Sequence, residues 1–149
     1  MSRITRGCWI VVADGAGAMI LENVGTAVAP DLRLIDRIET RKIEDHHDRA
    51  GRMADGGPNQ RSALEVTDRE RLAESAMVAT LMTRLAFSVR QSQIARIAIA
   101  APPQLLGAIR ARMEDDLRSR VVLMLPKTLT NHPLEKIVAL MGDAMDRAA

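Results

Sequence analysis

The sequence predicts an α/β fold in which helices cover a mixed five-stranded sheet. Two observations support this class. Three strand-like segments follow one another within residues 1–40, and strand-like and helix-like segments alternate from about residue 67 onward. The chain has 149 residues, of which 47% are apolar and 27% charged, a composition typical of globular domains. We therefore expect one domain over residues 1–149 with a buried core.

Three antiparallel strands are expected at the N-terminus. Residues 8–13, with the sequence CWIVVA, form a continuous apolar run, which is typical of a central strand buried on both faces. The sequence Asp-Gly-Ala-Gly at 14–17 predicts a turn into a second strand at 18–24. Apolar and charged residues alternate over 31–38, which predicts a half-exposed strand at the edge of the sheet.

A long helix is predicted from its start signal and its apolar stripe. Thr67 and Glu70 have the spacing of a capping box, so we expect the helix to begin there and to run to about Arg90. The apolar side chains expected to face the sheet are Leu72, Val78, Ala79, Met82, Leu85, Ala86 and Val89.

Two further strand–helix units complete the pattern. A strand at 94–101 is followed by Pro102-Pro103, and proline suits the first turn of the helix that we expect to reach Leu117. A fifth strand at 121–125 precedes a last helix at about 134–145. The element order is therefore β-β-β-α-β-α-β-α. Right-handed crossovers then give the spatial strand order 3-2-1-4-5, a three-layer, ribonuclease H-like arrangement.

Charge and cysteine content limit the classes of partner. The net charge is only +2 and is spread along the chain, so net charge alone does not predict polyanion binding. Both aromatic residues, Trp9 and Phe87, lie in apolar segments, which gives no sign of a base-stacking surface. The single cysteine, Cys8, excludes an intramolecular disulfide and is expected to be a small buried apolar residue.

No export or membrane segment is predicted. No apolar run approaches the roughly 18 residues of a membrane helix. The apolar stretch near the N-terminus is also too short for the core of a signal peptide. We therefore expect a cytoplasmic protein without membrane insertion, for which a homo-oligomer stays open.

Residues 39–62 lack periodicity and are predicted to form a long flexible loop, which in a compact domain is usually functional or disordered. The loop contains His46-His47-Asp48, whose residue types are those of metal ligands. Adjacent ligands on a flexible loop do not easily converge on one ion. We therefore expect no metal site, and nothing in the sequence indicates a cofactor.

Asp14 is a candidate nuclease carboxylate, because metal-dependent nucleases gather several carboxylates around two metal ions. Glu74 on the long helix is the other candidate in reach. The fourth strand, however, ends in Ala100-Ala101 and supplies no carboxylate. We interpret Asp14 as a turn carboxylate that caps the backbone amides of the following glycine-rich turn.

A binding crevice is predicted where the first and fourth strands end. Parallel neighbouring strands bring their carboxyl ends together, and open α/β sheets bind ligands at such places. The helix that begins there offers free backbone amides to an anion, and arginines of the long loop would close over it. The candidate residues for binding a ligand or partner are Asp14, Gly15, Gly17, Arg49, Arg52, Arg61, Pro102, Pro103 and Gln104.

Several segments together resemble the bacterial host attachment protein family. They are WIVVADGA at 9–16, LEN at 21–23, DRAGR at 48–52, SALE at 62–65, IAIAAPPQLLGAIR at 97–110 and LTNHP at 129–133. They span nearly the whole chain in order. That family in turn is similar to the central-domain fold of archaeal and eukaryotic peptide-chain release factor 1.

The resemblance implies a non-enzymatic, cytoplasmic binding or regulatory protein that contacts the ribosome, RNA or a protein partner, and that affects attachment to host cells indirectly. Release factors use a Gly-Gly-Gln tripeptide for hydrolysis. Residues 56–60, GGPNQ, are only superficially similar, so hydrolysis is not predicted. The alternative is an enzyme or sensor that binds a small phosphorylated or nucleotide ligand in the crevice.

Overall fold

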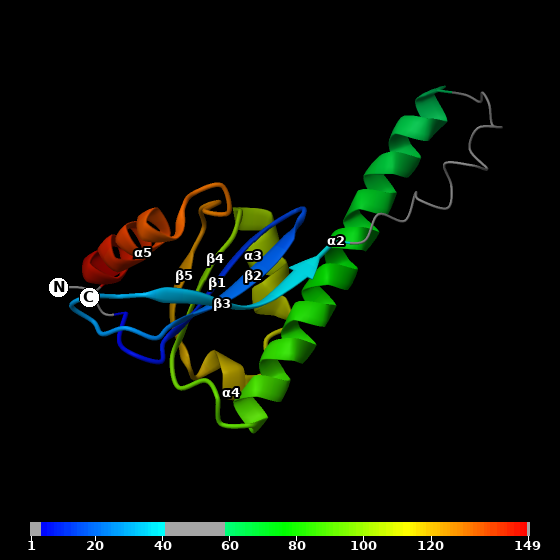
Figure 1. The fold of residues 1–149 in the computed structure, drawn as a ribbon. Coiled ribbons are helices and arrows are strands. Elements are labelled where there is room, and N and C mark those ends of the chain that lie inside the picture. The colour runs from blue at the N-terminus through cyan, green and yellow to red at the C-terminus, as the bar shows by residue number, and fades with distance from the viewer. Residues whose placement is uncertain (1–3, 41–58, 149) are drawn as a thin grey trace.

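The computed structural model describes residues 4–40 and 59–148, and for 59–67 only the backbone. Its sheet has the strand order β3-β2-β1-β4-β5, as predicted (Figure 1). The first three strands pair antiparallel, and β4 and β5 continue the sheet in parallel with β1. The strands are β1 (Trp9–Asp14), β2 (Gly17–Asn23), β3 (Leu32–Glu39), β4 (Ile97–Ala100) and β5 (Val121–Leu125).

Helices cover both faces of the sheet. They are α2 (Asn59–Arg90), α3 (Pro103–Ala111), α4 (Asp115–Arg118) and α5 (Leu134–Ala148). One core cluster joins the sheet to α2, α3 and α4, and a second joins it to α5, so the protein has three layers. The N-terminal turns of α2 extend beyond the sheet (Figure 1).

The central strand β1 supplies side chains to both core clusters. Trp9, Val11 and Ala13 pack towards α2 and α3, whereas Ile10 and Val12 pack towards α5. All five are buried. Complete burial of an aliphatic side chain stabilises a fold by about 1.5–3 kcal/mol. The buried aliphatic residues of this apolar run therefore contribute to the stability of the fold.

Cys8 precedes this strand and is buried in the α5-side cluster, as predicted. Burial raises the pKa of its thiol above the usual value, and nearby Arg96 offsets part of this effect. A buried thiol with a raised pKa holds little thiolate at neutral pH, so Cys8 acts as a core side chain.

The edge strand β3 carries a β-bulge that alters the predicted alternation of buried and exposed side chains. Consecutive residues of β2, Ile20 and Leu21, pair with Asp36 and Leu34, so Ile35 has no partner across the ladder. Asp36 consequently shares a face with Ile20, which is the face that α2 covers.

An ion pair joins this bulged strand to α2. Arg84 donates from Nε to Oδ2 of Asp36 at 2.9 Å, and its Nη1 donates to Oγ of buried Ser88. The guanidinium carbon of Arg84 also lies 6.0 Å from the centre of the Trp9 ring. Arg84 thus connects the edge strand, the long helix and the central strand.

The long helix begins earlier than predicted. Thr67 lies within α2 rather than at its start, which is at Asn59. Residues 59–66 contain neither glycine nor proline, so the helix continues back through the capping-box sequence. Residues 59–62 of the predicted 39–62 loop are therefore helical, Glu39 ends β3, and residues 41–58 lie outside the described part of the chain.

Two other predicted elements differ from the structure. The strand expected at 94–101 is limited to β4, and the helix expected to run from Pro103 to Leu117 is divided into α3 and α4. Glu114 interrupts it with an extended backbone, φ −80° and ψ 158°. The following Asp115 and Asp116 favour the start of a new helix, because carboxylates interact well with a helix N-terminus.

Leu72 of α2 faces outward, contrary to expectation, and so does Phe87, which the predicted apolar stripe does not include. Leu72 and Phe87 are 63% and 49% exposed. Nine residues separate Leu72 from buried Leu81, and at 3.6 residues per turn this places them on opposite sides of the helix. An 18-residue window within Asp68–Arg90 is apolar and long enough to cross a membrane. Half of this window is buried, and its buried residues pack on the sheet as a core helix does.

Asn23 is a fully buried polar side chain that holds three segments together. Its Nδ2 donates to the carbonyl oxygens of Ile4 at 2.9 Å and Thr26 at 3.3 Å. Its Oδ1 accepts from the backbone amides of Gly25 at 2.9 Å and Asp31 at 2.8 Å. The amide thus connects the N-terminal segment, the end of β2 and the loop to β3.

We predict that Asn23→Ala lowers the free energy of unfolding by about 2–4 kcal/mol, because several backbone groups lose their buried partner. Urea denaturation measures the change. Asn131→Ala removes the same group from an exposed position and is expected to change stability by less than about 0.5 kcal/mol. Equal effects of the two substitutions would contradict the role given to Asn23.

The Asp36–Arg84 pair predicts a pH-dependent contribution to stability. The hydrogen bond from Arg84 and that from the Arg37 backbone amide lower the pKa of Asp36 from its usual value of 3.8. The pair therefore stabilises the folded state above the unfolded-state pKa, and this contribution is lost as the pH falls through the folded-state pKa.

At neutral pH, Asp36→Asn is expected to cost at most about 1 kcal/mol, because the pair is partly exposed. The difference from wild type should shrink as the pH falls below 3.8. Urea denaturation at a series of pH values measures this difference. A constant difference across the series would show that the charge of Asp36 is not the cause.

Candidate functional site

The parallel strands β1, β4 and β5 end at one edge of the sheet, which we call the carboxyl edge. Val12 of β1 pairs with Ala100 of β4, so Asp14 and Pro102 follow at neighbouring positions of this edge. The predicted juxtaposition of the first and fourth strands is thus present. Because open α/β sheets bind ligands at this edge, the carboxyl edge is the first place to search for a site.

Asp14 is held by two hydrogen bonds at this edge. The backbone amide of Ala16 donates to its Oδ1 at 2.8 Å, which confirms the turn-capping interpretation. Thr130 donates from Oγ1 to its Oδ2 at 2.5 Å. The β1–β2 turn is therefore fixed to the loop that precedes α5.

A cavity of about 410 Å³ opens beside Asp14, and we call it the edge cavity. The β1–β2 turn, the end of β3 and the loop before α5 enclose it. Its lining combines one cation, two carboxylates, hydroxyl groups and an amide. The residues that bear its polar groups are Asp14, Arg37, Glu39, Thr40, Thr130 and Asn131.

Thr40 gives this cavity an unsatisfied polar group. Its backbone amide donates to the carbonyl oxygen of Ala16 at 2.9 Å, which fixes the residue beside the turn. Its Oγ1 is buried and has no hydrogen-bond partner among the described residues. Buried polar atoms are normally paired, and the chain continues from Thr40 directly into residues outside the described part.

The structure brings together only part of the predicted site. Asp14 and Gly17 line the edge cavity, and Gly15 lies in the adjacent turn. Pro102, Pro103 and Gln104 share the carboxyl edge at the start of α3 but are not among the residues that line this cavity.

The structure does not test the binding role predicted for the loop arginines. Arg49 and Arg52 lie outside the described residues, and Arg61 is described only by its place in α2. Their predicted binding role therefore stays a prediction.

The sequence did not predict Arg37, Thr40 and Thr130 as site residues, because no local pattern marks them. Thr130 and Asp14 are separated by 116 positions in the chain.

Within residues 4–40 and 59–148, no group of three histidine, cysteine or acidic side chains is placed to hold a metal ion. The two candidate nuclease carboxylates make other contacts in the structure. Asp14 binds Thr130, whereas Glu74 of α2 lies over the turn at Gly15. His46-His47-Asp48 lies outside the described residues.

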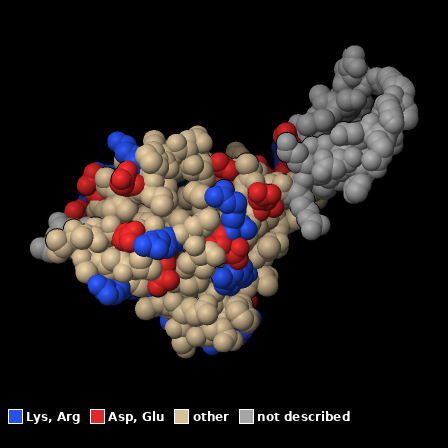
Figure 2. Space-filling view, in the orientation of Figure 1, with Lys and Arg blue, Asp and Glu red and all other residues tan. Residues whose placement is uncertain are grey.

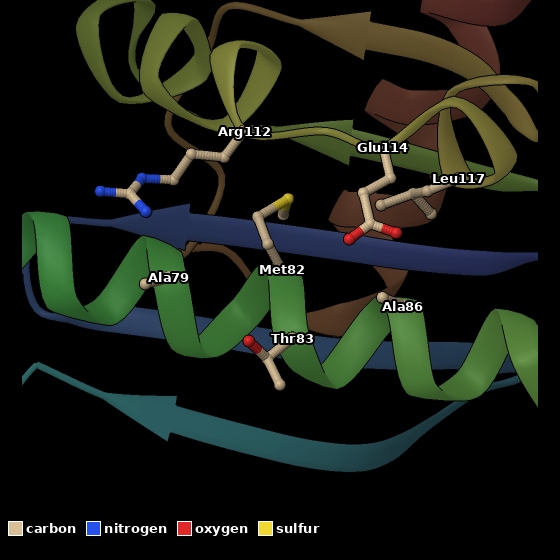
Figure 3. A pocket seen from close by; sticks show the side chains of 7 residues that line it. All are labelled: Ala79, Met82, Thr83, Ala86, Arg112, Glu114 and Leu117. Carbon is tan, nitrogen blue, oxygen red and sulfur yellow. The ribbon is translucent and has the colours of Figure 1, made fainter.

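A second, smaller cavity of about 200 Å³ lies between α2 and the α3–α4 segment (Figure 3). Arg112 and Glu114 extend towards α2 across it, and Arg112 donates to Oγ of Ser75 at 3.1 Å. The floor is formed by small and apolar side chains such as Ala79 and Ala86. We call this cavity the helix seam.

The surface in Figure 2 carries acidic and basic side chains side by side, with no large field of one sign on that face. This agrees with the small net charge of +2. A partner that binds such a face recognises shape and a few individual charges, because no broad potential attracts it.

The described residues thus form a three-layer α/β protein with a polar cavity at the carboxyl edge of its parallel strands. Residues 7–141 match the model of the bacterial archaeo-eukaryotic release factor family 12, and the chain belongs to this family. The release-factor kinship expected from the sequence is thereby confirmed. No curated protein matches the chain.

Among solved structures, the chain is similar to Dom34 of S. cerevisiae, with 10% sequence identity and a TM-score of 0.41. The similarity covers 97% of this chain and 37% of Dom34. Dom34 is described as a translation termination-like factor that is involved in RNA quality control pathways and interacts with Hbs1.

We predict that the protein tolerates alanine less well at Gly17, in the wall of the edge cavity, than at Gly15. A methyl group at Gly17 would lie 2.4 Å from the backbone carbonyl oxygen of Ile38, whereas one at Gly15 would meet only the flexible end of Glu74. We expect Gly17→Ala to cost about 1–3 kcal/mol, because the β2–β3 backbone must move. Gly15→Ala should cost less than about 0.5 kcal/mol. Thermal denaturation of both variants checks this, and a larger loss at Gly15 would contradict it.

Proposed function

We propose that this chain is a non-enzymatic binding module of the cytoplasm that contacts the ribosome through ribosomal RNA. The observation that carries the proposal is the membership of residues 7–141 in a release factor family. Any effect on attachment to host cells would then be an indirect result of an action on translation.

The edge cavity is the contact surface that we propose. Arg37 is the one cationic residue among the described residues that line it, and it is exposed. A guanidinium pairs well with a phosphate group, and hydroxyl and amide groups such as those of Thr130 and Asn131 also bind the nucleic-acid backbone.

The carboxylates of the cavity restrict which RNA can bind. Asp14 and Glu39 stand in the same lining as Arg37, and they repel a general polyanion. Binding should therefore involve few phosphates and depend weakly on salt, since each lost phosphate contact changes the salt slope by about one. Arg49 and Arg52 of the predicted loop belong to the same proposal as additional phosphate contacts.

Catalysis is not part of the proposal. The sequence lacks the Gly-Gly-Gln tripeptide by which release factors hydrolyse peptidyl-tRNA. Among the described residues, those that line the edge cavity include no cysteine, histidine or lysine. We therefore propose that the module binds and does not hydrolyse.

We predict that Arg37→Ala weakens co-sedimentation with bacterial ribosomes several-fold and lowers the salt slope of binding by about one. Arg33→Ala is the matched control. It removes the same charge from the same exposed strand, but from a residue outside the edge cavity and next to Asp31. Both variants should keep wild-type stability within about 0.5 kcal/mol. Equal loss of binding in both would place the contact elsewhere, and wild-type protein that does not sediment with ribosomes would reject the proposed function.

A second candidate function is a sensor or enzyme that binds a small phosphorylated or nucleotide ligand at the carboxyl edge. The volume of the edge cavity, about 410 Å³, and the presence of Arg37 in its lining favour this candidate. Calorimetric titration with ATP and GTP discriminates the two. Saturable binding that disappears in Arg37→Ala, without ribosome binding by the wild type, would support the second candidate.

A further inference from the structure

The guanidinium of Arg84, on α2, is held by groups from three elements of the fold. Its Nε donates to Oδ2 of Asp36 at 2.9 Å, and its Nη1 donates to Oγ of buried Ser88. Its central carbon also lies 6.0 Å from the centre of the buried Trp9 ring, within the range of a cation–π interaction. Because hydrogen bonds from a guanidinium are strong and directional, these contacts fix the orientation of the group.

Asp36 connects this guanidinium to the backbone of β3. Its Oδ2 accepts from Arg84, and its Oδ1 accepts from the backbone amide of Arg37 at 2.8 Å. Both oxygens of one planar carboxylate are therefore engaged in hydrogen bonds. The peptide group that joins Asp36 to Arg37 is consequently held in a fixed position relative to α2.

Arg37 lies on the opposite face of the sheet from Arg84. Neighbouring residues of a strand alternate between the two faces, and Asp36 is on the face that α2 covers. Arg37 pairs with Met19, whose side chain packs against the core cluster on the α5 side. Arg37 therefore contributes to the edge cavity from one face of the sheet, while its backbone is anchored from the other.

The position of β3 in the sheet explains why this anchor matters. β3 is an edge strand, so it pairs with a neighbouring strand on one side only. The bulge at Ile35 interrupts this pairing directly before Asp36. Bulges bend a strand and change the direction of the side chains beside them, so pairing alone does not determine the direction of the segment that follows. The contact with Arg84 determines it at the first residue after the bulge.

We propose that Arg84 is a positioning residue of the edge cavity, which holds the backbone of Arg37 through Asp36 so that the Arg37 guanidinium meets a phosphate of the ligand. The inference rests on the proposed function, in which Arg37 makes that contact. Arg84 is not among the described residues that line the edge cavity, so it acts through β3 and not on the ligand. Replacing Arg84 should therefore weaken binding only as far as Arg37 contributes to binding.

A double-mutant cycle measured by co-sedimentation with bacterial ribosomes tests the proposal. Arg84→Met keeps most of the aliphatic stem and removes every hydrogen-bond donor of the side chain. In the wild-type background it should weaken binding several-fold, as Arg37→Ala does. In the Arg37→Ala background it should cause no further loss, because the group that it positions is already absent. Arg112→Met is the matched control, since Arg112 also bonds to a hydroxyl of α2, that of Ser75, but lies outside the edge cavity. This control should leave binding unchanged.

A purely structural role of Arg84 gives a different pattern. If Arg84→Met weakened binding by destabilising the fold, the loss would be the same in both backgrounds, and this outcome would overturn the proposal. Unchanged binding of Arg84→Met, where Arg37→Ala does weaken binding, would overturn it as well. Circular dichroism checks that each variant is folded. Asp36→Ala breaks the same connection at a partly exposed residue, and its effect should depend on Arg37 in the same way.

Backbone ¹⁵N relaxation tests the positioning role without any ligand. In wild-type protein the order parameter of the Arg37 amide should be about 0.85, the value of rigid backbone, and in Arg84→Met it should fall clearly below this value. The amides of Gly25 and Asp31, which the side chain of Asn23 holds, should be unchanged. Wild-type protein that does not sediment with ribosomes would reject the proposed function, whereas an unchanged order parameter at Arg37 would overturn the positioning role itself.

Discussion

Burial of β1 on both faces is the constraint on which the rest of this structure depends. A strand whose side chains are apolar in succession must be covered from two sides, and here α2 and α3 cover one side while α5 covers the other. The sheet must also extend in both directions from β1, by antiparallel β2 on one side and parallel β4 on the other. The carboxyl edge with its cavity is a consequence, because it lies where this central strand ends.

Two polar interactions determine how the outer segments of the chain attach to the sheet. Apolar contacts are not directional, so they do not by themselves fix how the outer segments attach to the sheet. The Asn23 amide fixes the N-terminal segment and the loop to β3 through directional bonds. The Arg84–Asp36 pair fixes the edge strand to α2. Asn23 lies at the opposite end of β2 from the edge cavity, whereas Asp36 directly precedes Arg37, which lines it.

The strands and their order could be predicted because each strand is encoded by a short local pattern, such as the run at 8–13. The helix boundaries were less accurate, since the capping-box spacing at Thr67 is a local signal that the longer helix-favouring segment overrides. The orientation of Leu72 was missed because a broad apolar stripe does not show which part meets the sheet. Most of the edge cavity was missed for another reason: the contact of Thr130 with Asp14 depends on the whole fold.

Both edges of the sheet carry an irregular strand. Ile35 is unpaired in β3, and in β5 the residues that pair with consecutive positions of β4 are Val121 and Leu123, which leaves out Val122. An irregular edge cannot form a continuous ladder with a strand from another molecule, and charged side chains such as Arg33 and Arg37 on β3 strengthen this effect. Growth of the sheet from molecule to molecule, the usual route to amyloid-like aggregates, is therefore disfavoured at both ends.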